Sequence, residues 1–262
     1  MIMEITSVEF IPLQTRLEYI ESLELAIHFD ENLIDPCTEA LSFSTTTSSA
    51  KVVGGSAVSF LPGVPAAQQQ DVLNSTLLAQ LAANKKYDRE KQTVQWYQYY
   101  QQVLGNLGWV IQSFSFNSFN TGNLSFTVDK AILGILMAAL SGNELAVLTS
   151  TIKALGNLSA KNKRAIQIFE NSGSQGAGGN FQMSQATLDG NQNVSMSIGA
   201  NHFKSNKHVT NFLFFKFKSK DIDLYAGNQR AILNDQIYST VRSAVIAKLG
   251  ANAQKFVGDL DI

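Results

Sequence analysis

The stretch NFQMSQATLDGNQNVSMSIGANHF, residues 180–203, contains the clearest strand pattern in the chain. Apolar and small polar residues alternate on both sides of Asp189 and Gly190, and a period of two is typical of strands because successive side chains point to opposite faces. An Asp-Gly pair between two such runs predicts a hairpin turn. The apolar members of the two strands are Phe181, Met183, Val194, Met196 and Ile198.

The segments that flank this hairpin predict further strands and a final helix. Residues 163–173 contain two isoleucines two positions apart, which indicates a strand. Residues 210–228 alternate apolar and lysine side chains and predict two strands. Residues 234–250 repeat apolar side chains every three or four positions between a capping residue and a glycine stop, so we expect an amphipathic helix there.

The first half of the chain predicts helices and two more β units. Residues 13–27, 66–84 and 88–108 have apolar side chains at helical spacing. Residues 41–61 alternate on either side of a Gly-Gly break and predict two strands. Residues 109–128 alternate phenylalanine and leucine with serine, asparagine and threonine around a turn, which predicts a hairpin.

The most apolar part of the chain is DKAILGILMAALSGNELAVLTSTIKALGN, residues 129–157. Its uninterrupted apolar run, residues 131–140, would extend only about 15 Å as a helix, against about 30 Å for the core of a bilayer. A second amphipathic helix follows a Ser-Gly-Asn turn and begins near Glu144. We expect an αα-hairpin with a fully buried first arm, and a hairpin that dips into a membrane remains the alternative.

Together these elements predict one α+β domain over residues 1–262. We expect a mainly antiparallel β-sheet flanked by amphipathic helices and by the αα-hairpin. The chain has no repeat, long linker or change of composition that would divide it.

The composition excludes some classes of function. The net charge is −1 and the isoelectric point is about 6.3, which argues against a nucleic-acid partner bound through its phosphates. Charged residues make up only 16% of the chain, and serine, threonine, asparagine and glutamine are abundant instead. A surface of this kind suits proteins that face glycans, act outside cells or associate with themselves.

Cysteine and histidine give no pattern for a metal or disulfide site. Cys37 is the single cysteine, so no disulfide can form within the chain. We interpret Cys37 as a small buried hydrophobic residue, with acylation or intermolecular pairing as alternatives. His28, His202 and His208 show no spacing typical of zinc sites, and nothing in the sequence calls for a cofactor.

The beginning of the sequence has early acidic residues and no long apolar run, so we expect no secretory signal peptide. On this interpretation the protein is soluble when made and leaves its cell by lysis or by a dedicated secretion route.

No constellation of residues predicts catalysis, and we expect a protein that is not an enzyme. A G-x-S-x-G elbow is missing, and His202 and His208 lie in a segment that is expected to be a solvated turn. The glycine-rich residues 173–180 resemble a phosphate loop, but a strand follows them where a helix would be required. A flexible hinge is the better interpretation of this segment.

The polar and apolar alternation of the strands predicts a membrane-active function. A strand that crosses a bilayer in a barrel needs about 9–11 residues, apolar outside and polar inside. We therefore expect a pore-forming or cytolytic toxin or virulence factor that acts on target-cell membranes, with membrane lipids and copies of itself as its partners. The candidates for membrane insertion are Phe181, Met183, Val194, Met196, Ile198, Phe215 and Phe217. The candidates for contact with lipid headgroups are Lys204, Lys207, Lys216, Lys218 and Lys220.

Two other functions stay open. One is a self-assembling structural protein, such as a coat, sheath or inclusion component, whose amide-rich surface serves lateral packing. The other is a carbohydrate-binding module with an aromatic platform, for which the candidates are Trp96, Tyr97, Tyr100 and Trp109.

The predicted layout of helices around a central antiparallel sheet resembles that of the Cyt-type cytolytic and insecticidal toxins. The resemblance is architectural and covers most of the chain. No family motif matches residue by residue, so the resemblance implies a membrane-active toxin without assigning any site residue.

Overall fold

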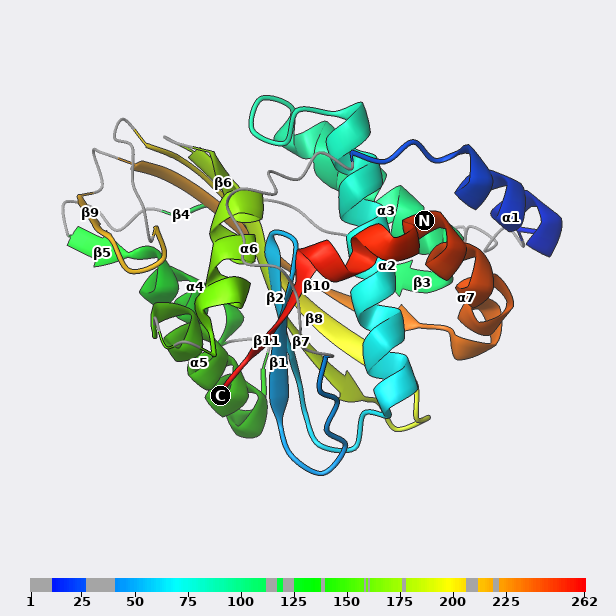
Figure 1. The fold of residues 1–262 in the computed structure, drawn as a ribbon. Coiled ribbons are helices and arrows are strands. Elements are labelled where there is room, and N and C mark those ends of the chain that lie inside the picture. Colours follow the sequence, from blue (N-terminus) through cyan, green and yellow to red (C-terminus); the bar gives the residue numbers. More distant parts are fainter. Residues whose placement is uncertain are drawn as a thin grey trace, which may run out of the picture.

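A computed structural model shows an α+β protein built around one large twisted sheet (Figure 1). The structure describes residues 11–26, 41–111, 117–119, 125–137, 140–157, 159, 161–175, 178–205, 212–218 and 222–262. The predicted fold class is confirmed: the sheet is mostly antiparallel and helices flank it. Cys37, His28, His208, Lys207 and Lys220 lie outside the described residues.

The helices are α1 (Leu13–Ser22), α2 (Ala66–Lys86), α3 (Thr93–Asn106), α4 (Val128–Leu136), α5 (Gly142–Gly156), α6 (Lys163–Gly173) and α7 (Asp235–Leu249), with a 3-10 helix η3 (Gly250–Phe256) after the last. The strands are β1 (Ser49–Val53), β2 (Ser56–Phe60), β3 (Trp109–Ile111), β4 (Asn117–Phe119), β5 (Ser125–Thr127), β6 (Ser174–Gln175), β7 (Gly178–Leu188), β8 (Val194–Ser205), β9 (Lys216–Lys218), β10 (Ile222–Leu233) and β11 (Val257–Leu260).

The large sheet has the strand order β11-β1-β2-β7-β8-β10-β3, and β5 and β9 form a separate small sheet. All neighbours are antiparallel except β2 and β7. The predicted hairpin of β7 and β8 is confirmed, with Leu188 paired to Val194 at the turn. Asp189 organises that turn: its Oδ1 atom accepts the backbone N–H groups of Asn191 (2.8 Å) and Asn193 (2.9 Å).

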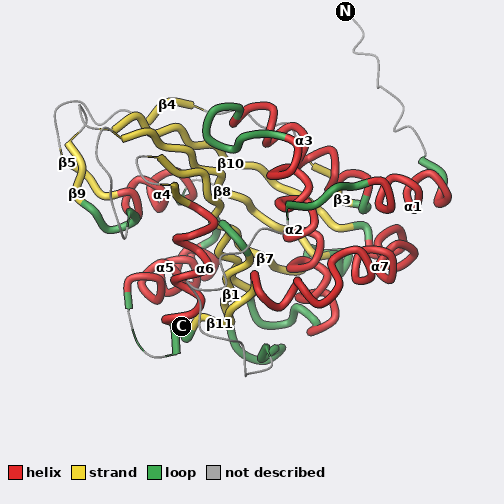
Figure 2. The backbone as a smooth tube through the Cα atoms, turned by 45° about the horizontal axis from the view of Figure 1, so that its top comes forward, coloured by secondary structure: helices red, strands yellow, loops and turns green. Residues whose placement is uncertain are grey.

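Helices cover both faces of the sheet (Figure 2). We call α1, α2, α3 and α7 the α2 layer, and α4, α5 and α6 the α4 layer. Each layer forms its own hydrophobic core with the sheet face beneath it. Val58, Met196 and Ile198 belong to the core under the α2 layer, whereas Phe181 and Met183 belong to the core under the α4 layer.

In the α2 layer, α2 and α7 begin and end close to the predicted positions, whereas α1 is shorter than predicted and ends at Ser22. Pro65 precedes the first residue of α2, where the missing N–H group costs no helical hydrogen bond. The Asn234 side chain accepts the N–H group of Ile237 (3.1 Å) and so caps α7, and Gly250 ends that helix with φ of +57°.

The segment that was expected to be a strand at residues 163–173 is helix α6. Its apolar residues also fit helical spacing, because Ile166 and Phe169 are three positions apart and both are buried against the sheet. The two isoleucines that suggested a strand therefore lie at the two edges of one broad buried helix face, with Ala165 and Phe169 between them. In the first β unit, the strand before the Gly-Gly turn is β1, and the predicted strand positions Leu41 and Phe43 lie in a loop.

Within the described residues, two predicted hairpins are wrong in their pairing; residues 112–116 and 120–124 of the first one lie outside the described residues. The strands β4 and β5, expected to pair with each other, pair with β10 and β9 respectively. Likewise β9 and β10 do not pair with each other, because β10 continues the large sheet beside β8. Strands of three residues contain too few ladder bonds to hold a local hairpin, so tertiary pairing decides their partners.

The αα-hairpin packs in the core, as predicted, through Val128, Ile132 and Leu136 of α4 and Leu148 and Ile152 of α5. A capping box begins α5: Ser141 and Glu144 exchange side chain to backbone hydrogen bonds. The expectation of a fully buried first arm is wrong, because α4 is amphipathic. Its outer side exposes Lys130 and Gly134, and Met137 after it is 59% exposed.

Candidate functional site

A polar network lies in the interior where β2 and β7 meet α2 and α3. The Gln80 side-chain amide donates to the Ser56 hydroxyl (2.8 Å), and Ser56 donates to the side-chain oxygen Oε1 of Gln182 (2.5 Å). Nearby, the Tyr97 hydroxyl donates to the Asn180 side chain (2.6 Å). Burial raises the pKa of Tyr97, so this hydroxyl stays protonated and acts as a donor.

Arg89 is the charged centre of this network. It follows α2, is buried, and donates to the backbone carbonyl groups of Ser172 at the end of α6 and of Asn180 in β7. Its guanidinium lies 4.9 Å above the ring of Trp96. Burial lowers the pKa of Arg89 to about 10, which leaves it charged near neutral pH. One side chain therefore links both helical layers to the central sheet.

Gly55 leaves the space that Arg89 fills. A Cβ atom on Gly55 would lie 2.9 Å from Arg89 Nη2 and 3.0 Å from the Ser172 carbonyl oxygen. The Asn180 side-chain amide completes the contact by donating to the Arg89 carbonyl group (3.1 Å). The guanidinium thus sits in a fitted site between the Gly-Gly turn, α6 and β7.

The expectation of a solvated turn is wrong for His202, because this residue lies within β8 and is buried in the same interior as Arg89. Its Nδ1 atom is 3.4 Å from the Thr93 hydroxyl, and its ring stacks on Tyr225 with 6.2 Å between centroids. Burial, together with the charges of Lys204 and Arg89, lowers the pKa of His202 to about 4, against a weaker opposing hydrogen bond with the Gly179 backbone.

We predict that His202 makes the fold sensitive to acid. The unfolded ring binds a proton below about pH 6.5 and the folded ring only near pH 4, so stability is lost as the pH falls between these values. Urea unfolding at about pH 7.5 and about pH 4.5 measures this. The His202→Gln variant should lose measurably less stability than the native chain over that interval, and an equal loss in both proteins would contradict the prediction.

The strand register separates the predicted insertion residues into two groups. Ile198 pairs with Ser184 and Met183 pairs with Gly199, so Ile198 and Met183 point to opposite faces of the sheet. Val194, Met196 and Ile198 face the α2 layer, whereas Phe181 and Met183 face the α4 layer. Phe217 is buried in the core under the α4 layer, and Phe215 is 39% exposed. The structure does not bring the seven residues onto one surface.

The half of the sheet next to the β7–β8 turn is amphipathic, and we call it the turn-side half-sheet. Toward the α2 layer it presents Ala186, Leu188, Val194, Met196, Ile198, Ala200, Ala231 and Leu233. Toward the α4 layer it presents mainly small or polar residues, namely Gln185, Thr187, Ser195, Ser197, Gly199, Asn228 and Arg230. At the other end of the strands the polarity is reversed: Phe181 and Leu224 face the α4 layer, and Asn180 and His202 face the α2 layer.

Three of the predicted headgroup lysines lie within the described residues, and all three are exposed. Lys216 and Lys218 project from the same side of β9, while Phe217 between them points into the core. Lys204 lies near the end of β8, opposite Asp223 in the register with β10. Figure 1 shows β5 and β9 at one end of the molecule, far from α1 and α7.

The four residues of the predicted aromatic platform are all buried. Trp96, Tyr97, Tyr100 and Trp109 are at most 3% exposed. Trp96 stacks on Tyr100 with 5.4 Å between ring centroids and donates to Asn84 (2.8 Å), and Trp109 donates to Ser75 (3.0 Å). These rings hold α2, α3 and the sheet together, so they form no surface that a sugar could reach.

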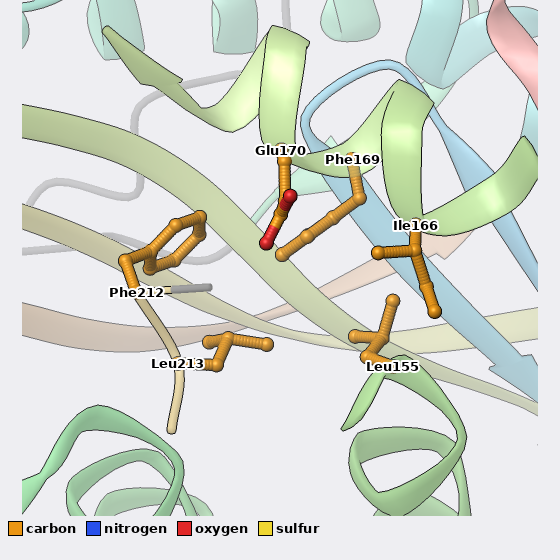
Figure 3. Close-up of a pocket in the computed structure, with 6 residues that line it drawn as sticks. All are labelled: Leu155, Ile166, Phe169, Glu170, Phe212 and Leu213. Atoms are coloured by element: carbon orange, nitrogen blue, oxygen red, sulfur yellow. The ribbon is translucent and has the colours of Figure 1, made fainter. Parts of the chain in front are cut away.

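A small cavity lies between α5, α6 and the segment before β9 (Figure 3). Its lining is apolar apart from Glu170, whose carboxylate points from α6 into the space between Phe169 and Phe212. The cavity volume is about 10 Å³, which is about the space that one water molecule requires. No organic ligand fits there.

Across the described ranges, no group of three histidine, cysteine, aspartate or glutamate residues is placed to hold a metal ion. Among the described helices, none combines the length and the apolar composition needed to span a bilayer.

The structure defines an α+β protein in which two helical layers enclose a sheet, with one hydrophobic core on each face of that sheet. A buried polar network around Arg89 links the layers to the sheet. No protein-family model matches the chain, and no curated protein matches it by sequence. Among solved structures it is similar to the Evf virulence factor (TM-score 0.36, 12% identity, 95% of this chain and 91% of that chain). It is also similar to a delta-endotoxin (TM-score 0.41, 12% identity, 76% of this chain and 86% of that chain). At these TM-scores neither similarity carries an argument about function.

Proposed function

We propose that this chain is a non-enzymatic, membrane-active protein of the toxin or virulence class. The observation that supports this most is the set of neighbouring antiparallel strands β7, β8 and β10, which are 11, 12 and 12 residues long. Each is as long as the 9–11 residues or so that cross a bilayer in a β-barrel. In the proposal, the helical layers cover these strands until the protein meets a target membrane.

The nature of the contact between α4 and the sheet supports the proposal that the α4 layer can detach. A Cβ atom on Gly199 would lie 2.8 Å from Leu136 Cδ1, so Leu136 covers the polar face of the turn-side half-sheet. The Gln185 Nε2 atom on that face is buried without a hydrogen-bond partner among the described residues. An apolar helix gains less from a polar surface than from an apolar one, and a buried unpaired amide costs about 1–3 kcal/mol. Both effects weaken the attachment of the α4 layer to the sheet.

Detachment of α4 would expose two surfaces, its own apolar side and the polar sheet face beneath it, and each is suited to its new surroundings. The apolar side of α4, with Val128, Ile132 and Leu136, fits the interface of a membrane as an amphipathic helix does. The serines and amides that α4 leaves behind are readily solvated. We therefore propose that α4 and α5 make the first rearrangement at the membrane.

We propose that strand insertion comes later, because the insertion candidates lie on opposite faces of the sheet. In the observed register a lipid-facing surface contains Val194, Met196 and Ile198 without Phe181 and Met183, and it reaches lipid only if the α2 layer also moves. The apolar face from Val194 to Ala200 extends about 20 Å at about 3.3 Å per residue. Three strands cannot close a barrel of eight or so, so insertion requires copies of the chain to associate.

Lys216 and Lys218 are proposed to make the first contact with anionic headgroups, with the partly exposed Phe215 beside them. A lysine near such a surface contributes about 1 kcal/mol. We predict that Lys216→Gln with Lys218→Gln weakens binding to phosphatidylserine vesicles about thirtyfold at low salt. Co-sedimentation measures this, and the matched control is Lys85→Gln with Lys91→Gln. Equal loss of binding in both double variants would contradict the assignment of β9.

The function itself is tested by release of a trapped dye from liposomes. Anionic and neutral liposomes are mixed with the protein, with and without light proteolysis. We expect release, faster from the anionic liposomes. If neither lipid composition leaks at micromolar protein, the proposed function is wrong.

A further inference from the structure

An open cleft of about 570 Å³ lies at the end of the large sheet. The turn between β7 and β8, the end of β10, the first turn of α7, the start of α2 and the edge strand β3 meet there. In Figure 1 the β7–β8 turn is seen beside the start of α2. Its volume is in the range of small-molecule sites. The cleft is separate from the Arg89 network and from β9.

The polar residues that line this cleft are almost all asparagine or glutamine, whose side chains carry an amide group. An amide offers two donors and one acceptor oxygen, the combination that pairs with neighbouring hydroxyl groups, each of which donates and accepts. The amides come from three places in the fold: α2, the β7–β8 turn and the start of α7. They are Gln68, Asn191, Gln192, Asn193, Asn234 and Gln236.

The charges around the cleft favour a neutral ligand. Among the described residues, Asp235 is the only charged one in the lining, and Arg242 Nη2 lies 3.4 Å from its Oδ1 atom. Arg242 also binds Asp71 through two hydrogen bonds of 2.8 and 2.7 Å, which fixes its position. Within the described part of the chain, no lysine, arginine or histidine belongs to the lining, so these residues offer nothing to hold a phosphate or a carboxylate. A single paired carboxylate is also too little for a divalent cation.

An apolar patch completes the lining. Val110 is 62% exposed, and it is paired with Ile232 in the register of β3 and β10. A pair of aliphatic side chains beside six amides matches a molecule with hydroxyl groups on its rim and C–H groups on its faces. That is the chemistry of a sugar ring.

We propose that this cleft binds a neutral saccharide, with the amides on its hydroxyl groups and Val110 and Ile232 on a C–H face. The turn that supplies three of the amides is held in place before binding, because Asp189 accepts two of its backbone N–H groups. Gln192 has a φ of +64°, which is uncommon for a residue with a side chain. The proposal does not rest on the membrane function.

Saturation-transfer difference NMR on the full chain tests this proposal. The probes are glucose, galactose, mannose, N-acetylglucosamine and lactose, with sialic acid as an anionic comparison. We expect at least one neutral sugar to bind saturably below ~10 mM and sialic acid to bind about tenfold more weakly or not at all. The test variant combines Asn191→Ala, Gln192→Gly and Gln236→Ala, all at exposed positions.

The triple variant should bind the same sugar at least about tenfold more weakly. The matched control is Gln95→Ala with Gln98→Ala, which removes two exposed amides from α3 and should leave binding unchanged. Two results would overturn the assignment: no saturable binding of any sugar to the native chain, or native affinity in the triple variant. Dye release from liposomes without glycolipid should be equal in the native chain and the triple variant, so failure of this proposal and failure of the membrane proposal are distinguished.

Discussion

Replacing Arg89 with methionine is expected to lower the free energy of unfolding by about 2–4 kcal/mol. Methionine fills much of the same volume but donates no hydrogen bond, so the carbonyl groups of Ser172 and Asn180 lose their charged donor. The stack on Trp96 is lost as well. Buried carbonyl groups without a donor bear the full cost of desolvation, which is why the expected loss is large.

Urea unfolding measures this loss, with Arg230→Met as the control, because Arg230 is exposed on β10. The control should stay within about 0.5 kcal/mol of the native chain. Arg89→Lys should recover only part of the loss, because one ammonium group cannot reproduce the planar fork that reaches two carbonyl groups. A native-like stability in Arg89→Met would contradict the role assigned to this residue.

The second large effect is expected from a disulfide between α4 and β8. In a Cys37→Ser background, Leu136→Cys with Gly199→Cys places the two sulfurs within bonding distance, because a Cβ atom on residue 199 already lies 3.2 Å from Leu136 Cγ. The bond fixes α4 to the sheet. We expect dye release by the oxidised protein to fall at least about tenfold, since the first rearrangement is blocked.

Reduction of the same sample supplies the internal control, and release should return to the rate of the Cys37→Ser protein. The single variant Leu136→Cys, which cannot form the bond to residue 199, should release dye at one rate in both redox states. Gly199→Cys alone is not used as a control, because its Cβ atom would clash with Leu136. If the oxidised and reduced double variants release dye equally fast, movement of α4 away from β8 is not part of the mechanism.

Much of the fold could be predicted from local patterns. The β7–β8 hairpin combines an Asp-Gly turn with strict alternation, and α2, α3 and α7 combine helical spacing with recognisable ends. Helix α6 was not predictable in this way, because Ile166 and Ile168 fit a strand and Ile166 and Phe169 fit a helix within the same eleven residues. Tertiary packing against the sheet decides between them.

The site residues were harder to predict, because they depend on register and on distant contacts. Alternation within β7 and within β8 identifies an apolar side for each strand, but only their pairing shows that Met183 and Met196 face opposite layers. Nothing in the sequence next to Arg89 predicts that this residue is buried. Its neighbours Asp88, Glu90 and Lys91 suggest a solvated loop. Its burial follows from contacts with residues more than 80 positions away.

The central claim is that helices of the α4 layer leave the sheet at a membrane, and amide hydrogen exchange tests it most directly. The native chain is measured alone and bound to anionic liposomes, and exchange is compared for α4, α5 and the long strands. The account predicts that amides of α4 and α5 lose protection on liposomes while those of β7, β8 and β10 keep theirs. Unchanged protection of α4 and α5 in the bound protein would contradict it.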